Sequence, residues 1–123
     1  MAPCPLVAVV DDDESVRESL GGLFRSVGFA ARGFASAAAF LQSNDLPRTD
    51  CVILDVRMPG MGGLELQRRL VASHPEMPVI FMTAHDDAPT RCLALSGGAV
   101  DYLIKPFSEE ALLDAVRAAL GSK

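Results

Sequence analysis

Short apolar runs alternate along this chain with segments in which apolar residues recur at helical spacing. The runs are bounded by glycine, proline or acidic residues and are mostly rich in β-branched side chains, which is typical of strands buried on both faces of a sheet. Five strands are predicted, the second being the weakest: Leu6–Val10, Phe29–Gly33, Cys51–Leu54, Val79–Met82 and Val100–Ile104.

A helix is predicted after each strand. Gly28 provides a stop for the first helix, and Ser36 and Ser108 are suited to cap the second and the last. Asn44–Arg48 contains a proline and is predicted to be a loop. The predicted helices are Val16–Val27, Ala37–Gln42, Leu64–Ser73, Asp87–Leu95 and Glu109–Leu120. Regular alternation of strands and helices predicts an α/β fold, a doubly wound parallel sheet with helices on both faces.

Length and composition limit the classes of protein that fit. The chain has 123 residues, half of them apolar, so we expect one domain over residues 1–123. Its net charge of −5 gives no electrostatic footprint for nucleic acid. The apolar segment Met1–Val10 lacks a basic leader, and no run is long enough to span a membrane. We therefore expect a cytoplasmic protein with no membrane contact.

The cysteines have no disulfide or zinc-site spacing. There are three of them, scattered along the chain, which fits a reducing compartment. Cys51 and Cys92 lie within apolar segments, where cysteine usually behaves as a small buried side chain. We expect Cys92 and its neighbour Leu95 to face the core.

Polar side chains follow four of the five predicted strands. Asp11 and Asp12 follow the first, and Asp55, Thr83 and Lys105 follow the third, fourth and fifth. Each has an ordinary explanation: an acidic run favours a helix start, and a lone threonine or lysine is often solvated. However, the carboxyl ends of parallel strands meet at one edge of the sheet, where ligands bind. All of these residues would therefore converge on one site.

Three converging carboxylates repel one another unless a cation relieves them. Lys105 offers an ammonium group, and Mg²⁺ (or Mn²⁺) favours carboxylate oxygens such as those of Asp11, Asp12 and Asp55. The second oxygen of Asp55 could then attack phosphorus and form an aspartyl phosphate. Phosphoryl transfer requires mainly positioning and neutralisation of charge, and the Thr83 hydroxyl and Lys105 could contribute to both.

Taken together, these motifs resemble bacterial response-regulator receiver domains over essentially the whole chain. The matching stretches are Val9–Asp13, Leu54–Pro59 with Met61 and Gly63, Met82–Ala84 and Lys105–Phe107. Thr83–Asp86 and Gly98–Tyr102 resemble FixJ-like receivers in particular. The resemblance implies a flavodoxin-like (βα)5 fold with strand order 2-1-3-4-5. It also implies phosphorelay signalling, in which a sensor histidine kinase or phosphotransfer protein donates a phosphoryl group to Asp55.

The same resemblance implies a role for each residue. Asp11 and Asp12 would form the acidic pocket, Asp12 being the direct ligand of Mg²⁺. Arg57 would contribute its backbone carbonyl to the metal. Thr83 and Lys105 would contact the phosphoryl group, with Lys105 on a peptide bond to Pro106 that is often cis in the family. Movement of Thr83 would then let the switch aromatic, Tyr102, turn inward. His85 would modulate the lifetime of the phosphoryl group, or would simply be an exposed loop histidine.

Phosphorylation would reshape the surface formed by the last two helices and the last strand, and so control an output partner or effector domain, such as one acting on transcription. The resemblance also implies homodimerisation on phosphorylation. Such a domain is not an enzyme in the usual sense, although it catalyses its own phosphorylation and dephosphorylation. Two alternatives are an aspartate-nucleophile phosphatase and a phosphate-independent interaction module. The first typically needs a second aspartate two residues after the nucleophile, where this chain has Arg57.

Overall fold

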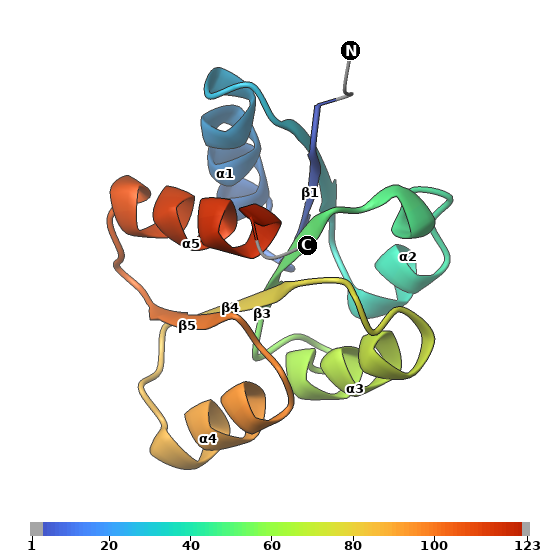
Figure 1. Ribbon diagram of the computed structural model, residues 1–123. Helices are drawn as coiled ribbons and strands as arrows, with labels where there is room; N and C mark the ends of the chain where they lie inside the picture. The colour runs from blue at the N-terminus through green and yellow to red at the C-terminus, as the bar shows by residue number, and fades with distance from the viewer. Residues whose placement is uncertain (1–3, 122–123) are drawn as a thin grey trace.

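A computed structural model describes residues 4–121 as a five-stranded parallel sheet between two layers of helices (Figure 1). Residues 1–3 and 122–123, at the two ends of the expected domain, lie outside the described residues. The strands are β1 (Leu6–Val10), β2 (Ala30–Phe34), β3 (Cys51–Asp55), β4 (Val79–Thr83) and β5 (Asp101–Ile104). The helices are α1 (Glu14–Ser26), α2 (Ala37–Leu41), α3 (Gly63–Ser73), α4 (Ala88–Ser96), α5 (Glu109–Gly121) and the short 3-10 helix η1 (Leu46–Arg48).

Strand β3 is the centre of the sheet. The order is β2-β1-β3-β4-β5, so the chain reverses its direction of travel across the sheet between β1 and β3. Val10 pairs with Leu54 and Asp55 pairs with Met82, which places the ends of β1, β3 and β4 at one edge. The predicted fold class and strand order are therefore confirmed.

Each face of the sheet has its own hydrophobic core. Figure 1 shows α1 and α5 on one face and α2, α3 and α4 on the other. Alternate residues of β3 divide between them: Ile53 packs with α1 and α5, whereas Leu54 packs with α2 and α3. Both side chains are fully buried. The near-continuous apolar runs in the sequence follow from this burial on both faces.

Local sequence accounts for the small differences between predicted and observed elements. Helix α1 begins earlier than predicted because the Asp13 side chain caps it, accepting hydrogen bonds from the backbone N–H groups of Ser15 and Val16. Strand β2 is shifted by one residue, and β5 begins one residue late, at Asp101. The predicted loop 44–48 contains η1, since Pro47 is compatible with the first turn of a helix.

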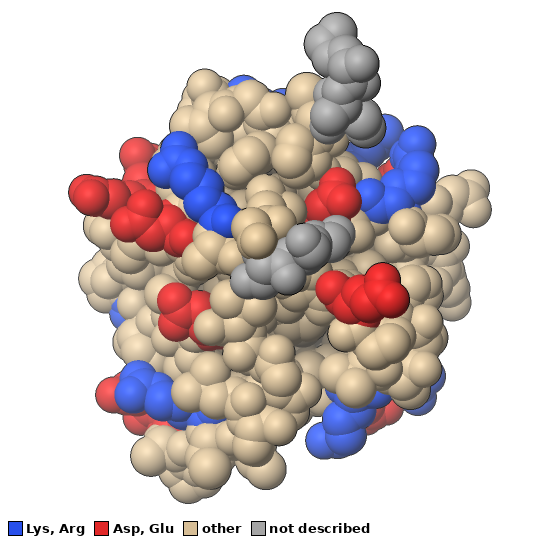
Figure 2. All heavy atoms as spheres, viewed as in Figure 1, with Lys and Arg blue, Asp and Glu red and all other residues tan. Residues whose placement is uncertain are grey.

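The prediction for Cys92 and Leu95 is wrong. Both are exposed, whereas Cys51 is buried as expected. The reason is that α4 packs through a narrow stripe in which Ala94 is its only buried residue. Elsewhere the described surface is ordinary: acidic and basic side chains are interspersed on the face seen in Figure 2. None of the helices in residues 4–121 has both the length and the apolar character needed to cross a membrane.

Candidate functional site

Three carboxylates meet where β1 and β3 end. Oxygen atoms of Asp11, Asp12 and Asp55 lie within 4.8 Å of one another. Asp11 is buried, Asp55 is half-buried and Asp12 is exposed, so the cluster opens to solvent on the side of Asp12. These oxygens form the type of donor set that a hard divalent cation prefers. The structure thus brings together the three carboxylates that were predicted as metal ligands, whereas the role of the Arg57 backbone carbonyl stays a prediction.

The environment of Asp55 disfavours its charge. Burial raises the pKa of the Asp55 carboxyl above its ordinary value of 3.8. The backbone N–H of Arg57 opposes this by donating a hydrogen bond to Asp55 Oδ1 at 3.2 Å, and Lys105 also lowers the pKa. The neighbouring charges of Asp11 and Asp12 raise it. A cation or an additional hydrogen-bond donor here would therefore stabilise the charged form of Asp55.

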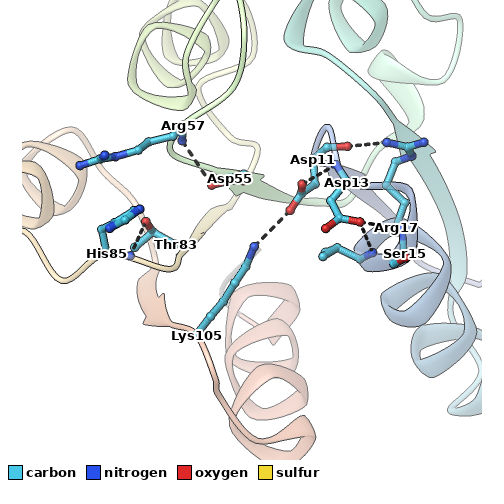
Figure 3. A network of polar contacts seen from close by, with 10 residues as sticks. Asp11, Asp13, Ser15, Arg17, Asp55, Arg57, Thr83, His85 and Lys105 are labelled. Carbon is cyan, nitrogen blue, oxygen red and sulfur yellow. Dashed lines mark hydrogen bonds and ion pairs between the residues drawn. The ribbon is translucent and has the colours of Figure 1, made fainter.

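Lys105 approaches the cluster from the end of β5 (Figure 3). Its Nζ lies 3.4 Å from Asp11 Oδ2. Its backbone N–H donates to the carbonyl of Thr83 at 2.7 Å, so the ends of β4 and β5 are joined beside the site. The Lys105–Pro106 peptide bond is cis. The ammonium group therefore faces the carboxylates, as the sequence predicted.

Thr83 ends β4 beside the Asp55 strand, and its side chain is almost fully buried. Its hydroxyl accepts a hydrogen bond from the backbone N–H of His85 at 3.1 Å. His85 itself is exposed, and in Figure 3 its side chain lies beside Thr83, on the side of Arg57. The Arg57 side chain is also exposed and extends away from the Asp55 carboxylate.

Gly63 determines how closely α3 can approach the site. A Cβ atom at this position would lie 2.5 Å from the carbonyl oxygen of Asp55 and 3.0 Å from the ring of Phe81. Its backbone N–H donates to the carbonyl of Val56 at 3.0 Å. Only a residue without a side chain fits here, so Gly63 shapes the backbone that presents Asp55.

Tyr102 lies apart from the acidic cluster, in the core beneath α4. The residue is 7% exposed, and its ring packs against Phe81 with 6.3 Å between ring centroids. Its hydroxyl is buried and has no hydrogen-bond partner among the described residues. The ring is therefore already inside in this structure, and its role as a switch stays a prediction.

Comparison with known proteins explains this arrangement. The family model for the response regulator receiver domain matches residues 7–117, which include every residue of the site. The chain belongs to the response regulator receiver family. This is a family of two-component signalling domains that interact with histidine kinases, and it is generally not catalytic.

Individual relatives place this receiver near FixJ, as the sequence predicted. Over 93% of its length the chain is 50% identical to nodulation protein W of Bradyrhizobium diazoefficiens, and over 94% it is 49% identical to the transcriptional regulatory protein FixJ of Azorhizobium caulinodans. It covers only 50% and 54% of those two proteins, so it spans about half the length of the curated relatives. A solved structure of the response regulator StyR superimposes with a TM-score of 0.88 at 48% identity, covering 97% of this chain and 60% of that one.

Two polar residues near the receiver site were not singled out by sequence reasoning. Asp13, in the same acidic run as Asp11 and Asp12, is the cap of α1, and its backbone N–H donates to Asp11 Oδ1 at 2.9 Å. Arg17, one turn further along α1, donates to the carbonyl of Asp11. The sequence signal for Arg17 is its position in the first turn of the predicted helix, within reach of the acidic residues that precede that helix.

Proposed function

We propose that this receiver accepts a phosphoryl group on Asp55 and uses it to switch a regulatory surface, with residues 1–123 acting as one phosphoacceptor unit. The observation that carries the proposal is the convergence of three carboxylates, the Lys105 ammonium and the Thr83 hydroxyl at one edge of the sheet. An Asp55 carboxylate oxygen would form a bond to phosphorus while the bond from phosphorus to the donor breaks. The donor would be a phosphohistidine of a sensor kinase or a phosphotransfer protein.

The acidic cluster fits Mg²⁺ or Mn²⁺. Asp12 is exposed and accepts no hydrogen bond from the described residues, so its oxygens are available as ligands, while Asp11 and Asp55 can each offer one. The backbone carbonyl of Arg57 would be a further oxygen ligand. When bound, the cation supplies positive charge that offsets the negative charge of the phosphoryl oxygens. Lys105, whose ammonium group lies 3.4 Å from Asp11 Oδ2, would contribute to the same neutralisation.

The phosphoryl group would act as a switch by recruiting new hydrogen bonds. It adds about −1.5 to −2 of charge, and each charge-assisted hydrogen bond contributes roughly 1.5–3 kcal/mol. Bonds from Thr83 and Lys105 that form in one state alone would shift a two-state equilibrium by about a hundredfold to ten-thousandfold. Because the Thr83 hydroxyl is bonded to the His85 backbone, its movement would also move the loop that leads to α4.

The donor protein would approach over an apolar groove beside the site. The groove has a volume of about 420 Å³, with Lys105 at its rim. Helix α1 contributes Val16, Leu20 and Leu23 to it, and Leu112 belongs to α5. A helix bearing a phosphohistidine would bury its apolar face there and carry the phosphoryl group toward Asp55.

The output surface would be formed by α4, β5 and α5 at the β5 edge of the sheet, which includes Tyr102 and lies next to Thr83 of β4. Leu93 and Leu95 of α4 are exposed and could contact a second copy or an effector. Several relatives are named as transcriptional regulatory proteins, and the chain spans about half of their length. We therefore infer that the output of the full protein is control of transcription through a separate effector domain.

Intact-mass measurement after incubation with acetyl phosphate and Mg²⁺ tests the proposal. We expect the wild-type protein to gain the mass of one phosphoryl group, and Asp55→Asn to gain none. An Asp12→Ala variant should gain the phosphoryl group far more slowly than wild type. A Cys92→Ser control should behave as wild type, because Cys92 is exposed on α4 and does not belong to the site. Phosphorylation of Asp55→Asn at the wild-type rate would show that another residue is the acceptor.

A further inference from the structure

Arg17 contacts the backbone of the acidic loop from behind. Its Nη1 donates a hydrogen bond to the carbonyl of Asp11 at 2.7 Å, and its own backbone N–H donates to the carbonyl of Asp13 at 3.1 Å. Figure 3 shows the guanidinium group on the far side of Asp11 from Lys105. The loop that carries Asp11 and Asp12 is thus held at its middle by one long side chain of α1.

Gly33 makes room for this contact. A Cβ atom on Gly33 would lie 3.2 Å from Cδ and 3.3 Å from Cβ of Arg17. The aliphatic part of Arg17 therefore lies directly against the backbone of β2. The next residue, Phe34, accepts a hydrogen bond from the backbone N–H of Asp11 at 3.1 Å. Strand β2, Arg17 and the acidic loop consequently form one packed unit.

Asp12 is the carboxylate whose position depends most on the order of this packed unit. Its carboxylate accepts no hydrogen bond from the described residues, whereas Asp11 is held by Lys105 and by the N–H of Asp13. The loop backbone therefore determines which positions the Asp12 carboxylate can reach. That backbone is fixed on one side by the Arg17 hydrogen bond.

We propose that Arg17 is a positioning residue that holds Asp11 and Asp12 in place for the divalent cation, with Gly33 as its required seat. The inference rests on the proposed function, in which these carboxylates bind Mg²⁺. Groups that orient metal ligands typically change metal affinity about 10-fold to 100-fold when they are removed. We expect an effect in that range for Arg17→Met, which retains the apolar stem but removes the donors.

The direction of the effect separates positioning from simple electrostatics. Arg17 carries a positive charge close to a cation site, so Coulomb repulsion alone predicts tighter Mg²⁺ binding when that charge is removed. Positioning predicts weaker binding instead. Gly33→Ala provides an independent perturbation, because it displaces the Arg17 stem and leaves the charge in the protein. Electrostatics predicts no change for Gly33→Ala, and positioning again predicts weaker binding.

The test measures binding of Mn²⁺ to the unphosphorylated protein by the electron paramagnetic resonance signal of the free ion, with Mg²⁺ as competitor. Titrations of wild type, Arg17→Met, Gly33→Ala and Asp12→Ala are run well below each unfolding temperature, which circular dichroism supplies. Matched controls are Arg25→Met on the last turn of α1, and Gly22→Ala, where a Cβ would meet no atom within 4 Å. Hydrogen exchange of the Asp13 amide, recorded without metal, reports the order of the loop.

We expect Arg17→Met and Gly33→Ala to bind Mn²⁺ about 10-fold to 100-fold more weakly, with faster exchange at Asp13, and both controls to match wild type. If wild type binds Mn²⁺ and Arg17→Met binds it equally or more tightly, the positioning role is refuted while the metal site stands. If Asp12→Ala binds Mn²⁺ as well as wild type does, the metal assignment itself fails, and the positioning role fails with it.

Discussion

Arg91 is predicted to hold the only tyrosine of this receiver in its buried position. The carbon at the centre of its guanidinium group lies 5.5 Å from the centroid of the Tyr102 ring, and its Nη2 lies 3.0 Å from Asp86 Oδ1. The residue thus joins the β4–α4 loop to β5 across the first turns of α4. The perturbation that tests this link is Arg91→Gln, which retains two methylene groups and a polar end but removes the guanidinium group and its charge.

The expected loss of stability follows from the two contacts. A cation–π contact at an exposed site contributes about 0.5–1 kcal/mol, and an exposed ion pair about 0.2–1 kcal/mol. Because 44% of the Arg91 side chain is exposed, solvent screens both contacts, and we take the lower half of each range. We therefore expect the free energy of unfolding to fall by about 1 kcal/mol. Asp86→Asn, which removes the ion pair alone, should account for less than half of that loss.

The assay uses the composition of the chain, which has one tyrosine and no tryptophan. Intrinsic fluorescence and its quenching by acrylamide therefore report Tyr102 alone, and we expect quenching to increase in Arg91→Gln. Absorbance titration adds a second measure. Burial and the Asp87 carboxylate raise the pKa of Tyr102, and Arg91 lowers it. Removing Arg91 while the ring stays buried would therefore raise that pKa further, whereas release of the ring to solvent would lower it toward its ordinary value.

Arg69→Gln is the matched control, since Arg69 forms an exposed ion pair with Glu65 at 3.2 Å but has no ring contact among the described residues. It should lose only a few tenths of a kcal/mol and leave the tyrosine signal unchanged. The reasoning is refuted if Arg91→Gln has the quenching, titration and urea midpoint of wild type, or if Arg69→Gln alters the tyrosine signal equally.

Two further predictions concern Asp55 and the glycine beside it. Burial raises the pKa of Asp55, so its protonated form is favoured on folding: that stability is present below pH 3.8 and is lost as the pH rises through the folded-state pKa. Asp55→Asn should therefore unfold at a higher urea concentration than wild type at pH 7 without metal. The difference between the two urea midpoints should shrink below pH 4. A difference that grew as the pH fell would contradict the electrostatic argument. Gly63→Ala should lower the free energy of unfolding by about 1–3 kcal/mol because its Cβ would overlap the Asp55 carbonyl. Gly22→Ala, on the open face of α1, should raise the free energy of unfolding by up to about 1 kcal/mol. Equal urea midpoints for the two variants would rule out the overlap.

The sequence was sufficient to predict the sheet because its signals are strong and local. β3 and β4 are continuous apolar runs, and buried parallel strands leave little room for any other pattern. The site followed from topology, since residues after strands of one parallel sheet share an edge. Asp11, Asp55 and Lys105 could therefore be grouped without coordinates.

What the sequence did not predict depends on packing between elements. The apolar pattern of α4 suggested that Cys92 and Leu95 face the core, but the helix turns only Ala94 fully inward. Arg17 and Arg91 resemble ordinary surface arginines in the sequence, because the groups that they contact lie outside their own helices. Arg17 contacts the carbonyl of Asp11, and Arg91 contacts the ring of Tyr102. The inward position of Tyr102 likewise depends on how α4 lies over β5, which no local pattern specifies.

The narrow attachment of α4 has an energetic consequence. Only Ala94, a small side chain, is fully buried on this helix, whereas α5 buries five residues. One buried polar contact supplements it: the side-chain amide of Gln67 on α3 donates to the carbonyl of Ala94 at 2.8 Å. Lifting α4 from the sheet thus exposes little apolar surface of the helix itself, so we expect its amides to exchange through a local opening while those of β3 require global unfolding. A conformational excitation of low cost is therefore located at the helix that the proposed output would use.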